Sequence, residues 1–186
     1  GAFSSDIMRQ ARDAGFSIFS FHPLQSFADS EATFRGCFIT IEGDEEAMPV
    51  AESLAVILDA RYHTIKAGAK ILYHAAAVMA CGGFVALEYK VLNLFEKIGI
   101  PREAGLAALM PILRGTLDNL ARLGPESALT GPFARGDSGT IKAHIEKMKE
   151  SSPDIVPVYN ILGKASLEIA DLPVEVKSRI KNILEA

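Results

Sequence analysis

"AKILYHAAAVMACGGF", residues 69–84, opens with three polar side chains and then becomes a long apolar run. Lys70, Tyr73 and His74 are spaced i, i+3 and i+4, so on a helix they share one face. The alanines that follow are small enough to let a ligand or another chain segment come close. We therefore interpret residues 68–98 as one long helix whose first turns carry chemistry, with a bend or a close helix contact at Gly82 and Gly83.

Two interpretations of Lys70 remain open at this point. A lysine held against an apolar helix can donate to a carbonyl oxygen or move a proton, because burial disfavours its charged form. Alternatively, Lys70 extends from the helix start into solvent and His74 caps the helix or fills a packing gap. The spacing alone does not separate these two interpretations.

The residues before this helix predict a small α/β layer. A short helix is expected near residues 4–15, followed by strands in the runs "FSIFSF" (16–21), "CFITIEG" (37–43) and "RYHTI" (61–65). The segment "DEEAMPVAESLAVILDA" (44–60) predicts a helix with acidic residues in its first turn, where the helix dipole favours them. Three strands are few for a sheet that buries both faces, so residues 1–66 are expected to be an incomplete part of a larger α/β domain.

After residue 67 the strand patterns end and helical patterns follow one another. They cover "IPREAGLAALMPILRGTLDNLARLG" (100–124), "TIKAHIEKMKES" (140–151), "PDIVPVYNILGKASLEIA" (153–170) and "LPVEVKSRIKNILEA" (172–186). Residues 67–186 are therefore expected to form an all-helical domain, which makes the fold class α+β overall.

The segment "LTGPFARGDSGT", residues 129–140, predicts a tight, exposed loop that presents Thr130, Arg135 and Asp137. Its glycine spacing imitates a phosphate-binding loop, but Asp137 stands where that motif requires a lysine. A carboxylate would repel phosphates, which excludes a nucleoside triphosphate site. Asp137 can cap the following helix, contact a ligand, or do both.

His22, in "HPLQSF", is expected at the end of a strand, because Pro23 biases it to an extended conformation. The carboxyl ends of strands are the usual ligand edge of open α/β sheets, which makes His22 a candidate site residue. The histidine spacings fit no metal ligand pattern, so no metal site is predicted. Cys37 and Cys81 lie in apolar runs and are expected to be buried thiols.

Charge and hydropathy exclude two classes of protein. A net charge of −4 and a pI near 5.6 argue against nucleic-acid binding, which requires clustered Lys and Arg. The longest apolar stretch, residues 75–87, is interrupted by two glycines and is shorter than the roughly 20 residues that cross a bilayer. No signal peptide is visible, so the chain is expected to be cytoplasmic and not to act on a membrane.

Five motifs in order resemble a known family. They are "FHPLQSF" (21–27), "FITIEGD" (38–44), "KILYHAAAVMA" (70–80), "LMPILRGTLDNLARLG" (109–124) and "ALTGPFARGDSGTIKAH" (128–144). Together they are similar to uncharacterised Rossmann-like oxidoreductases predicted to depend on NADP, relatives of ketopantoate reductase, pyrroline-5-carboxylate reductase and 6-phosphogluconate dehydrogenase. The resemblance extends to about residue 170. It implies that residues 1–66 are the rear portion of a Rossmann-like domain, and that residues 67–186 are a substrate and dimerisation domain of the 6-phosphogluconate dehydrogenase C-terminal type.

The resemblance also implies a reaction and a set of site residues. The reaction is hydride transfer between NADP and a small carbonyl or imine substrate. Lys70 would donate the proton or polarise the carbonyl, with His74 as its partner where the relatives have an amide, and His22 would lie on the cofactor side. Substrate contacts would come from Asn119, Thr130, Arg135 and Asp137, in a homodimer formed through the helical domain. A guanidinium pairs with a carboxylate in bidentate fashion, so Arg135 would suit an anionic substrate.

One departure from the family limits this expectation. The Gly-x-Gly-x-x-Gly turn that presents backbone N–H groups to a dinucleotide pyrophosphate occurs nowhere in the sequence. The chain is therefore interpreted as the C-terminal part of an oxidoreductase, inactive by itself. The alternative is a non-enzymatic helical interaction module that pairs through the alanine-rich face of residues 75–87.

Overall fold

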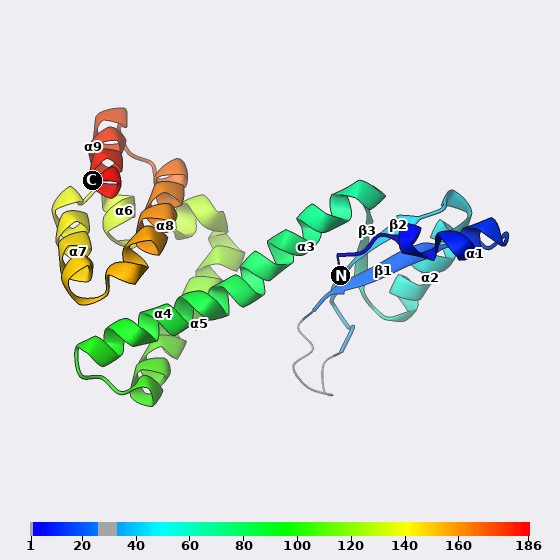
Figure 1. The fold of residues 1–186 in the computed structure, drawn as a ribbon, viewed down its shortest axis with the longest axis horizontal. Coiled ribbons are helices and arrows are strands. Elements are labelled where there is room, and N and C mark those ends of the chain that lie inside the picture. Colours follow the sequence, from blue (N-terminus) through cyan, green and yellow to red (C-terminus); the bar gives the residue numbers. More distant parts are fainter. Residues whose placement is uncertain (1, 26–32) are drawn as a thin grey trace. The chain divides into compact units, whose positions relative to one another are not determined.

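The computed structural model describes residues 2–25 and 33–186 (Figure 1). The chain divides into two compact units, residues 1–87 and residues 88–186, and each is described by itself. The division falls within the long helix, whereas the predicted boundary lies before it, after residue 66. The assignment of residues 1–66 to the rear portion of a Rossmann-like domain, and of residues 67–186 to a substrate and dimerisation domain, stays a prediction.

The first unit contains a three-stranded sheet. Its strands are β1 (Phe19–Leu24), β2 (Phe38–Gly43) and β3 (Arg61–Thr64), in the order β1-β2-β3, with β1 antiparallel and β3 parallel to β2. A short turn η1 (Ser5–Met8) and helix α1 (Arg9–Asp13) precede the sheet, and η2 (Glu45–Ala47) and α2 (Met48–Ile57) connect β2 to β3. The strands predicted in residues 37–43 and 61–65 are confirmed, and the strand predicted in residues 16–21 is observed at Phe19–Leu24.

The position predicted for His22 is wrong in one respect. Strand β1 continues through Pro23 to Leu24, so His22 lies within the strand and not at its end. Pro23 is tolerated there because β1 is an edge strand. The rule for carboxyl ends of parallel strands does not apply to β1, which is antiparallel to its neighbour.

Strand β2 separates two chemically different faces. Ile39 and Ile41 are completely buried and pack with Ala51 and Ala55 of α2 in an apolar core. Side chains alternate along a strand, so Thr40 and Glu42 point to the opposite face. These two side chains are also buried, at 2% exposure each, and a polar layer therefore lies on the face of the sheet away from α2.

The long predicted helix is confirmed, with a defect at its middle. It consists of η3 (Ala67–Ala69), α3 (Lys70–Val78), a π-helical turn η4 (Met79–Gly83) and α4 (Phe84–Lys97). The π turn occupies the place of the predicted bend, and such turns are frequent at functional sites. By length and composition alone, Ala67–Lys97 could cross a membrane. Within this helix, however, Lys70 is buried against Glu42 and Lys90 contacts Asp154, so each unit holds its part of the helix by a charged pair.

The second unit is helical, as predicted. It contains α5 (Arg102–Ala128), α6 (Gly131–Arg135), α7 (Ser138–Ser151), η5 (Pro153–Ile155), α8 (Val156–Ile169) and α9 (Val174–Glu185). Helix α5 is interrupted at Gly124, whose φ of 76° is non-helical. The buried core is formed mainly by α7, α8 and α9 and includes Ile141, Ile145, Ile180 and Leu184.

The prediction of a loop over residues 129–140 is wrong. This segment contains the short helix α6, which begins at Gly131 and ends at Arg135, and the C-cap residue Gly136 that follows it is in the left-handed conformation. Phe133, from the middle of α6, packs against the second core and lies 5.7 Å, ring centre to ring centre, from Tyr159. The packing of this partly buried aromatic ring against the core explains why a glycine-rich sequence adopts a helical turn.

Candidate functional site

The first turns of helix α3 contact the polar face of the sheet. On that face Ser20 of β1 lies directly opposite Glu42 of β2, and His22 lies opposite Thr40. Lys70, Tyr73 and His74 share one face of α3, as predicted, and this face meets the two cross-strand pairs. A contact between helix and sheet is usually apolar, so this polar layer is unusual and is the candidate site.

In one half of this layer the polar side chains are buried and have hydrogen-bond partners. The ammonium of Lys70, a residue with 3% exposure, contacts the Ser20 hydroxyl and lies 3.4 Å from Oε1 of Glu42. The Glu42 carboxylate also accepts hydrogen bonds from the backbone N–H of Ser5 (2.7 Å) and from the Ser5 hydroxyl (2.8 Å). A buried ion pair persists only when its remaining hydrogen-bonding capacity is met, and Ser5 and Ser20 meet it here.

The other half, which we call the unsatisfied half, contains buried polar atoms without hydrogen-bond partners among the described residues. Among the described residues, no hydrogen-bond partner is found for four buried polar atoms: Nδ1 of His22, Oγ1 of Thr40, the hydroxyl oxygen of Tyr73 and Nδ1 of His74. The His22 ring lies 5.4 Å from the Tyr73 ring, edge to face, and 5.8 Å from the His74 ring. Buried polar atoms are nearly always paired, so four together on one interface indicate a place where a ligand or water supplies the partner.

Burial shapes the protonation of this half. It lowers the pKa of His22 below its ordinary value, and nearby positive charge, including that of Lys70 and His74, lowers it further. Burial raises the pKa of Tyr73, while the Thr40 hydroxyl opposes that change without meeting the geometry of a hydrogen bond. Perturbed groups that gather beside a cavity are typical of functional sites.

A pocket of about 410 Å³ opens beside His22 and His74, two residues of the unsatisfied half. His22 and His74 provide its polar wall, and its remaining lining comes from β1, from the residues that follow it and from the π turn: Pro23, Leu24, Gln25, Ala77, Val78, Cys81 and Gly82. Cys81 is exposed, so the prediction that it is buried is wrong, while Cys37 is buried as predicted. A volume in this range fits a small organic molecule.

The four predicted substrate residues all belong to the second unit. Asn119, on α5, accepts a hydrogen bond of 3.0 Å from Arg122. Thr130 is at the N-cap position of α6, and Arg135, its last residue, is exposed. Asp137 caps α7 by accepting from the backbone N–H (3.0 Å) and the hydroxyl (2.7 Å) of Thr140, and these bonds lower its pKa. The capping interpretation of Asp137 is therefore confirmed, and its role toward a substrate stays a prediction.

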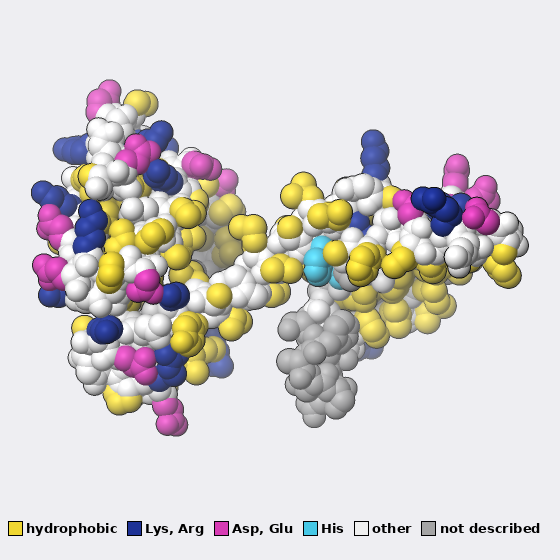
Figure 2. Space-filling view, in the orientation of Figure 1, with side chains coloured by type: hydrophobic (Ala, Val, Ile, Leu, Met, Phe, Trp, Pro, Cys, Tyr) yellow, Lys and Arg dark blue, Asp and Glu magenta, His cyan; other side chains and the backbone are white. Residues whose placement is uncertain are grey.

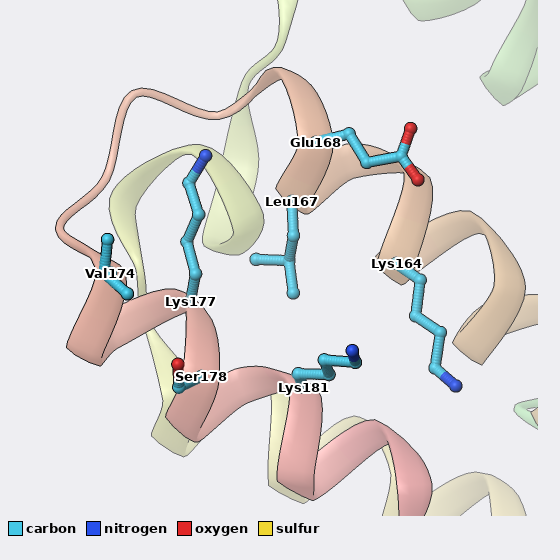
Figure 3. A pocket seen from close by; sticks show the side chains of 7 residues that line it. All are labelled: Lys164, Leu167, Glu168, Val174, Lys177, Ser178 and Lys181. Carbon is cyan, nitrogen blue, oxygen red and sulfur yellow. The ribbon is translucent and has the colours of Figure 1, made fainter.

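A second pocket, of about 470 Å³, lies between α8 and α9 (Figure 3). Three lysines line it, Lys164, Lys177 and Lys181, together with Leu167, Glu168, Val174 and Ser178. Figure 3 shows Lys177 extending away from Lys164. Lys164 is paired with Glu185 at 3.0 Å, and Glu168 adds a negative charge to the wall. The positive charges do not converge on one point, so this pocket is a weaker candidate for a ligand site than the pocket lined by His22 and His74.

Sequence reasoning found Lys70, His74 and His22 but missed the residues that face them. Glu42, Thr40 and Ser20 lie in strands that were predicted from their apolar character. The sequence does contain a pattern that could have revealed two of them: apolar and polar residues alternate in "FITIE", which places Thr40 and Glu42 on the same face of the strand. A carboxylate on the same face as buried strand residues requires a partner, and that requirement could have pointed to Lys70.

Comparisons with known proteins support the fold. The sequence model of the family described as "Domain of unknown function (DUF2520)" matches residues 37–166. The crystal structure of protein TM1727 from Thermotoga maritima is similar over 91% of this chain, with a TM-score of 0.80 and 26% identity. A structure described as "putative NADP oxidoreductase BF3122 from Bacteroides fragilis" is similar over 80% of the chain, with a TM-score of 0.64 and 23% identity.

These structures belong to longer chains. The present chain covers 66% of the Thermotoga protein and 56% of the Bacteroides protein. No curated protein matches the sequence. The similarities support the fold observed here, a small sheet followed by a large helical part.

Proposed function

Because this chain belongs to the family described as "Domain of unknown function (DUF2520)", a description that names no activity, we propose its function from its own site. We propose that it is part of an NAD(P)-dependent oxidoreductase that transfers a hydride to or from a small carbonyl or imine substrate. Lys70 and His74 are its catalytic residues, and His22 lies beside them. The observation that carries the proposal is the pocket lined by His22 and His74. It lies beside four buried polar atoms that have no partner among the described residues, and beside a buried lysine.

The chemistry of these side chains suits proton transfer. Reduction of a carbonyl to an alcohol takes up one hydride and one proton, and a reduced nicotinamide is the usual source of the hydride. An imidazole that lines the pocket can give or accept that proton near neutral pH. Lys70 supplies either the proton or a positive charge.

The residues of this chain do not fit the cofactor itself. The sequence lacks the Gly-x-Gly-x-x-Gly turn, whose backbone N–H groups bind the pyrophosphate of a dinucleotide. We therefore assign to this chain the binding of the substrate and the transfer of the proton.

The test uses the complete gene product. NADPH fluorescence should change on binding, and a screen of small carbonyl compounds should find one that oxidises NADPH. His74→Gln and Lys70→Ala should each reduce kcat while NADPH still binds. Normal turnover by both variants would overturn the assignment of the site. Absence of NADPH binding by the complete product would overturn the proposed activity.

The second candidate function is a helical dimerisation module, and the surface of α5 favours it. Gly105 is the only buried residue of this long helix, and its large apolar side chains are exposed: Leu106, Met110, Ile112, Leu117, Leu120 and Leu123. Figure 2 also shows hydrophobic side chains on the surface along α3 and α4. Apolar surface of this extent is typical of an interface, and a second copy of the chain is the partner we propose.

Sedimentation of the purified chain tests this candidate. A dimer is expected, and Leu117→Asp should shift it to the monomer because an unpaired charge would be buried at the interface. Val174→Asp is the matched control, since Val174 is an exposed apolar residue on α9. A chain that is monomeric before mutation would exclude the module, and would leave the oxidoreductase proposal untouched.

A further inference from the structure

We propose that the pocket beside His22 and His74 binds the apolar group of an uncharged carbonyl or imine compound, and that Gly82 is a specificity-determining residue which leaves room for that group. This assignment rests on the proposed function. It deepens that function by naming the class of substrate and a residue that selects it, and it concerns residues of the first unit alone.

The long helix contributes one continuous face to the pocket. The helical residues that line it recur at positions i, i+3, i+4, i+7 and i+8: His74, Ala77, Val78, Cys81 and Gly82. The same spacing leads back to Lys70 and Tyr73. Exposure rises along this face, from the buried Lys70 through the half-buried His74 to the exposed Gly82. The pocket therefore has an imidazole at its inner end and small side chains at its open end.

The walls of the pocket are largely apolar. None of the described residues that line it is a lysine, arginine, aspartate or glutamate. Leu24 from β1 and Val78 from α3 are 42% and 51% exposed, although both side chains are apolar. An apolar group between these walls would remove their surface from water, and each methylene that it buries should strengthen binding about fourfold.

An anionic group would meet no cation in these walls. The Lys70 ammonium is not part of the lining, and it is already paired with Glu42 at 3.4 Å. The amide of Gln25, which does line the pocket, donates a hydrogen bond of 3.1 Å to the backbone carbonyl of Thr33. A carboxylate that moves from water into such surroundings loses its hydration without gaining an ionic partner. The pocket should therefore select an uncharged compound over its carboxylate analogue.

Gly82 leaves space at the π turn. A Cβ placed on it would meet no atom within 4 Å, and its backbone does not have the positive φ that favours glycine. A larger side chain is therefore compatible with the helix and would take up space in the pocket. Gly83 is the matched control, because it follows in the same turn and does not line the pocket. Its Cβ would lie 3.7 Å from the backbone oxygen of Val78, which is an ordinary contact.

The test uses Cys81 as a reporter of occupancy on the chain as it exists. The sequence has two cysteines, and Cys81 is exposed in the pocket whereas Cys37 is buried. Iodoacetamide should therefore alkylate Cys81 first, and mass spectrometry gives the rate. The probes are methyl ethyl, methyl butyl and methyl hexyl ketone, and the three α-keto acids in which a carboxylate replaces the methyl group. N-acetylcysteine under the same conditions corrects for reaction of a probe with a free thiol.

The ketones should slow the alkylation of Cys81, and the concentration that halves its rate should fall about fourfold for each added methylene. Each α-keto acid should protect about tenfold less well than its ketone, because its charge is desolvated. Keto acids that protect as well as the ketones would overturn the choice of an uncharged substrate. Absence of protection by every ketone would overturn the assignment of the pocket.

Variants of the π turn test the role of Gly82. Gly82→Leu should weaken protection by the longest ketone about tenfold or more, the equivalent of roughly two methylenes, whereas Gly83→Leu should leave it unchanged. Equal effects of the two leucine variants would show that Gly82 does not select the substrate. If circular dichroism shows that Gly82→Leu is unfolded, Gly82→Ala and Gly83→Ala make the same comparison, with an expected loss of about fourfold at Gly82 alone.

Turnover of the complete gene product separates this assignment from the proposed function. With NADPH, kcat/KM should rise with the alkyl chain of the ketone in the wild type and in Gly83→Leu, but not in Gly82→Leu. If the ketones protect Cys81 and no carbonyl compound oxidises NADPH, the proposed function fails and the assignment of the pocket stands. If the α-keto acids protect Cys81 and are reduced while the ketones do neither, the proposed function stands and the assignment of an uncharged substrate fails.

Discussion

The ion pair of Lys70 and Glu42 is stable only as a pair. Lys70→Met leaves the Glu42 carboxylate buried without a cation, and such a change costs about 3–5 kcal/mol of unfolding free energy. The double variant Lys70→Met with Glu42→Leu should recover most of this loss, because apolar side chains often replace a buried pair at little cost. Urea unfolding of both variants measures the difference. Equal losses in the single and double variants would contradict this account.

His22 should make the stability of the chain depend on pH. Its pKa in the folded state lies below the ordinary value of 6.5, so the unfolded chain binds a proton first as the pH falls. The contribution of a neutral His22 is therefore complete above about pH 6.5 and is lost as the pH falls toward its folded pKa. His22→Gln should flatten the curve of unfolding free energy against pH in this window, and His63→Gln, on the exposed strand β3, should not. An unchanged slope in His22→Gln would contradict the prediction.

At the scale of single elements, Asp137 tests whether α7 needs its cap. Asp137→Ala should lower the thermal midpoint of unfolding because the N–H and hydroxyl of Thr140 lose their acceptor. Asp137→Asn should stay close to the wild type, since an asparagine oxygen caps equally well. The pKa of Asp137 is lowered, so the charged form contributes stability above about pH 3.8 that is lost as the pH falls through the folded pKa. Should Asp137→Asn unfold as easily as Asp137→Ala, capping would not be its role.

Two helical glycines differ in the space around them. A Cβ at Gly163, on α8, would lie 2.7 Å from Cζ of Phe133, so Gly163→Ala should destabilise the chain by about 1–3 kcal/mol through overpacking. A Cβ at Gly115, on α5, would meet no atom within 4 Å, so Gly115→Ala should stabilise by about 0.5–1 kcal/mol. Thermal unfolding of the two variants should shift in opposite directions. A neutral Gly163→Ala would mean that α6 is held by something other than Phe133.

The success of sequence-based prediction also depended on the element. The long helix, the strands and the helix that Asp137 caps follow from local periodicity and capping chemistry, so they could be predicted. Helix α6 could not, because it has only five residues and its bounding glycines are typical of loops as well. What fixes α6 is a contact between Phe133 and residues about 30 positions later in the chain, which no local pattern contains.

The candidate site shows the same limit. The spacing of Lys70, Tyr73 and His74 predicts their shared face, and the structure confirms it. The partners of that face come from β1, β2 and the first turn, and their arrangement depends on strand register. A one-residue slip of β1 would replace Ser20 and His22 by their neighbours, so the site exists only in the folded sheet.

At the scale of the whole molecule, the presence of two separate hydrophobic cores predicts that the two units unfold independently. One core joins Ile39 and Ile41 to α2, and the other joins α7, α8 and α9. Ile41→Ala and Ile145→Ala should each cost about 2–5 kcal/mol, because both side chains are almost completely buried. Amide hydrogen exchange should show that Ile41→Ala lowers protection within residues 2–25 and 33–87, and that Ile145→Ala lowers it within residues 88–186.

Whether the two units unfold independently depends on the long helix, because Ala67–Lys97 belongs to both of them. Its first turns depend on Lys70 and the sheet, and its last turns on Leu92, Leu94 and the helices they contact. The π turn between them interrupts the regular hydrogen bonding of the helix. We therefore expect the effect of each substitution on amide protection to stop at the π turn and not at either end of the helix. If Ile41→Ala instead lowers protection along the entire helix and into α7, the chain unfolds as one cooperative body and the division at residue 87 has no energetic meaning.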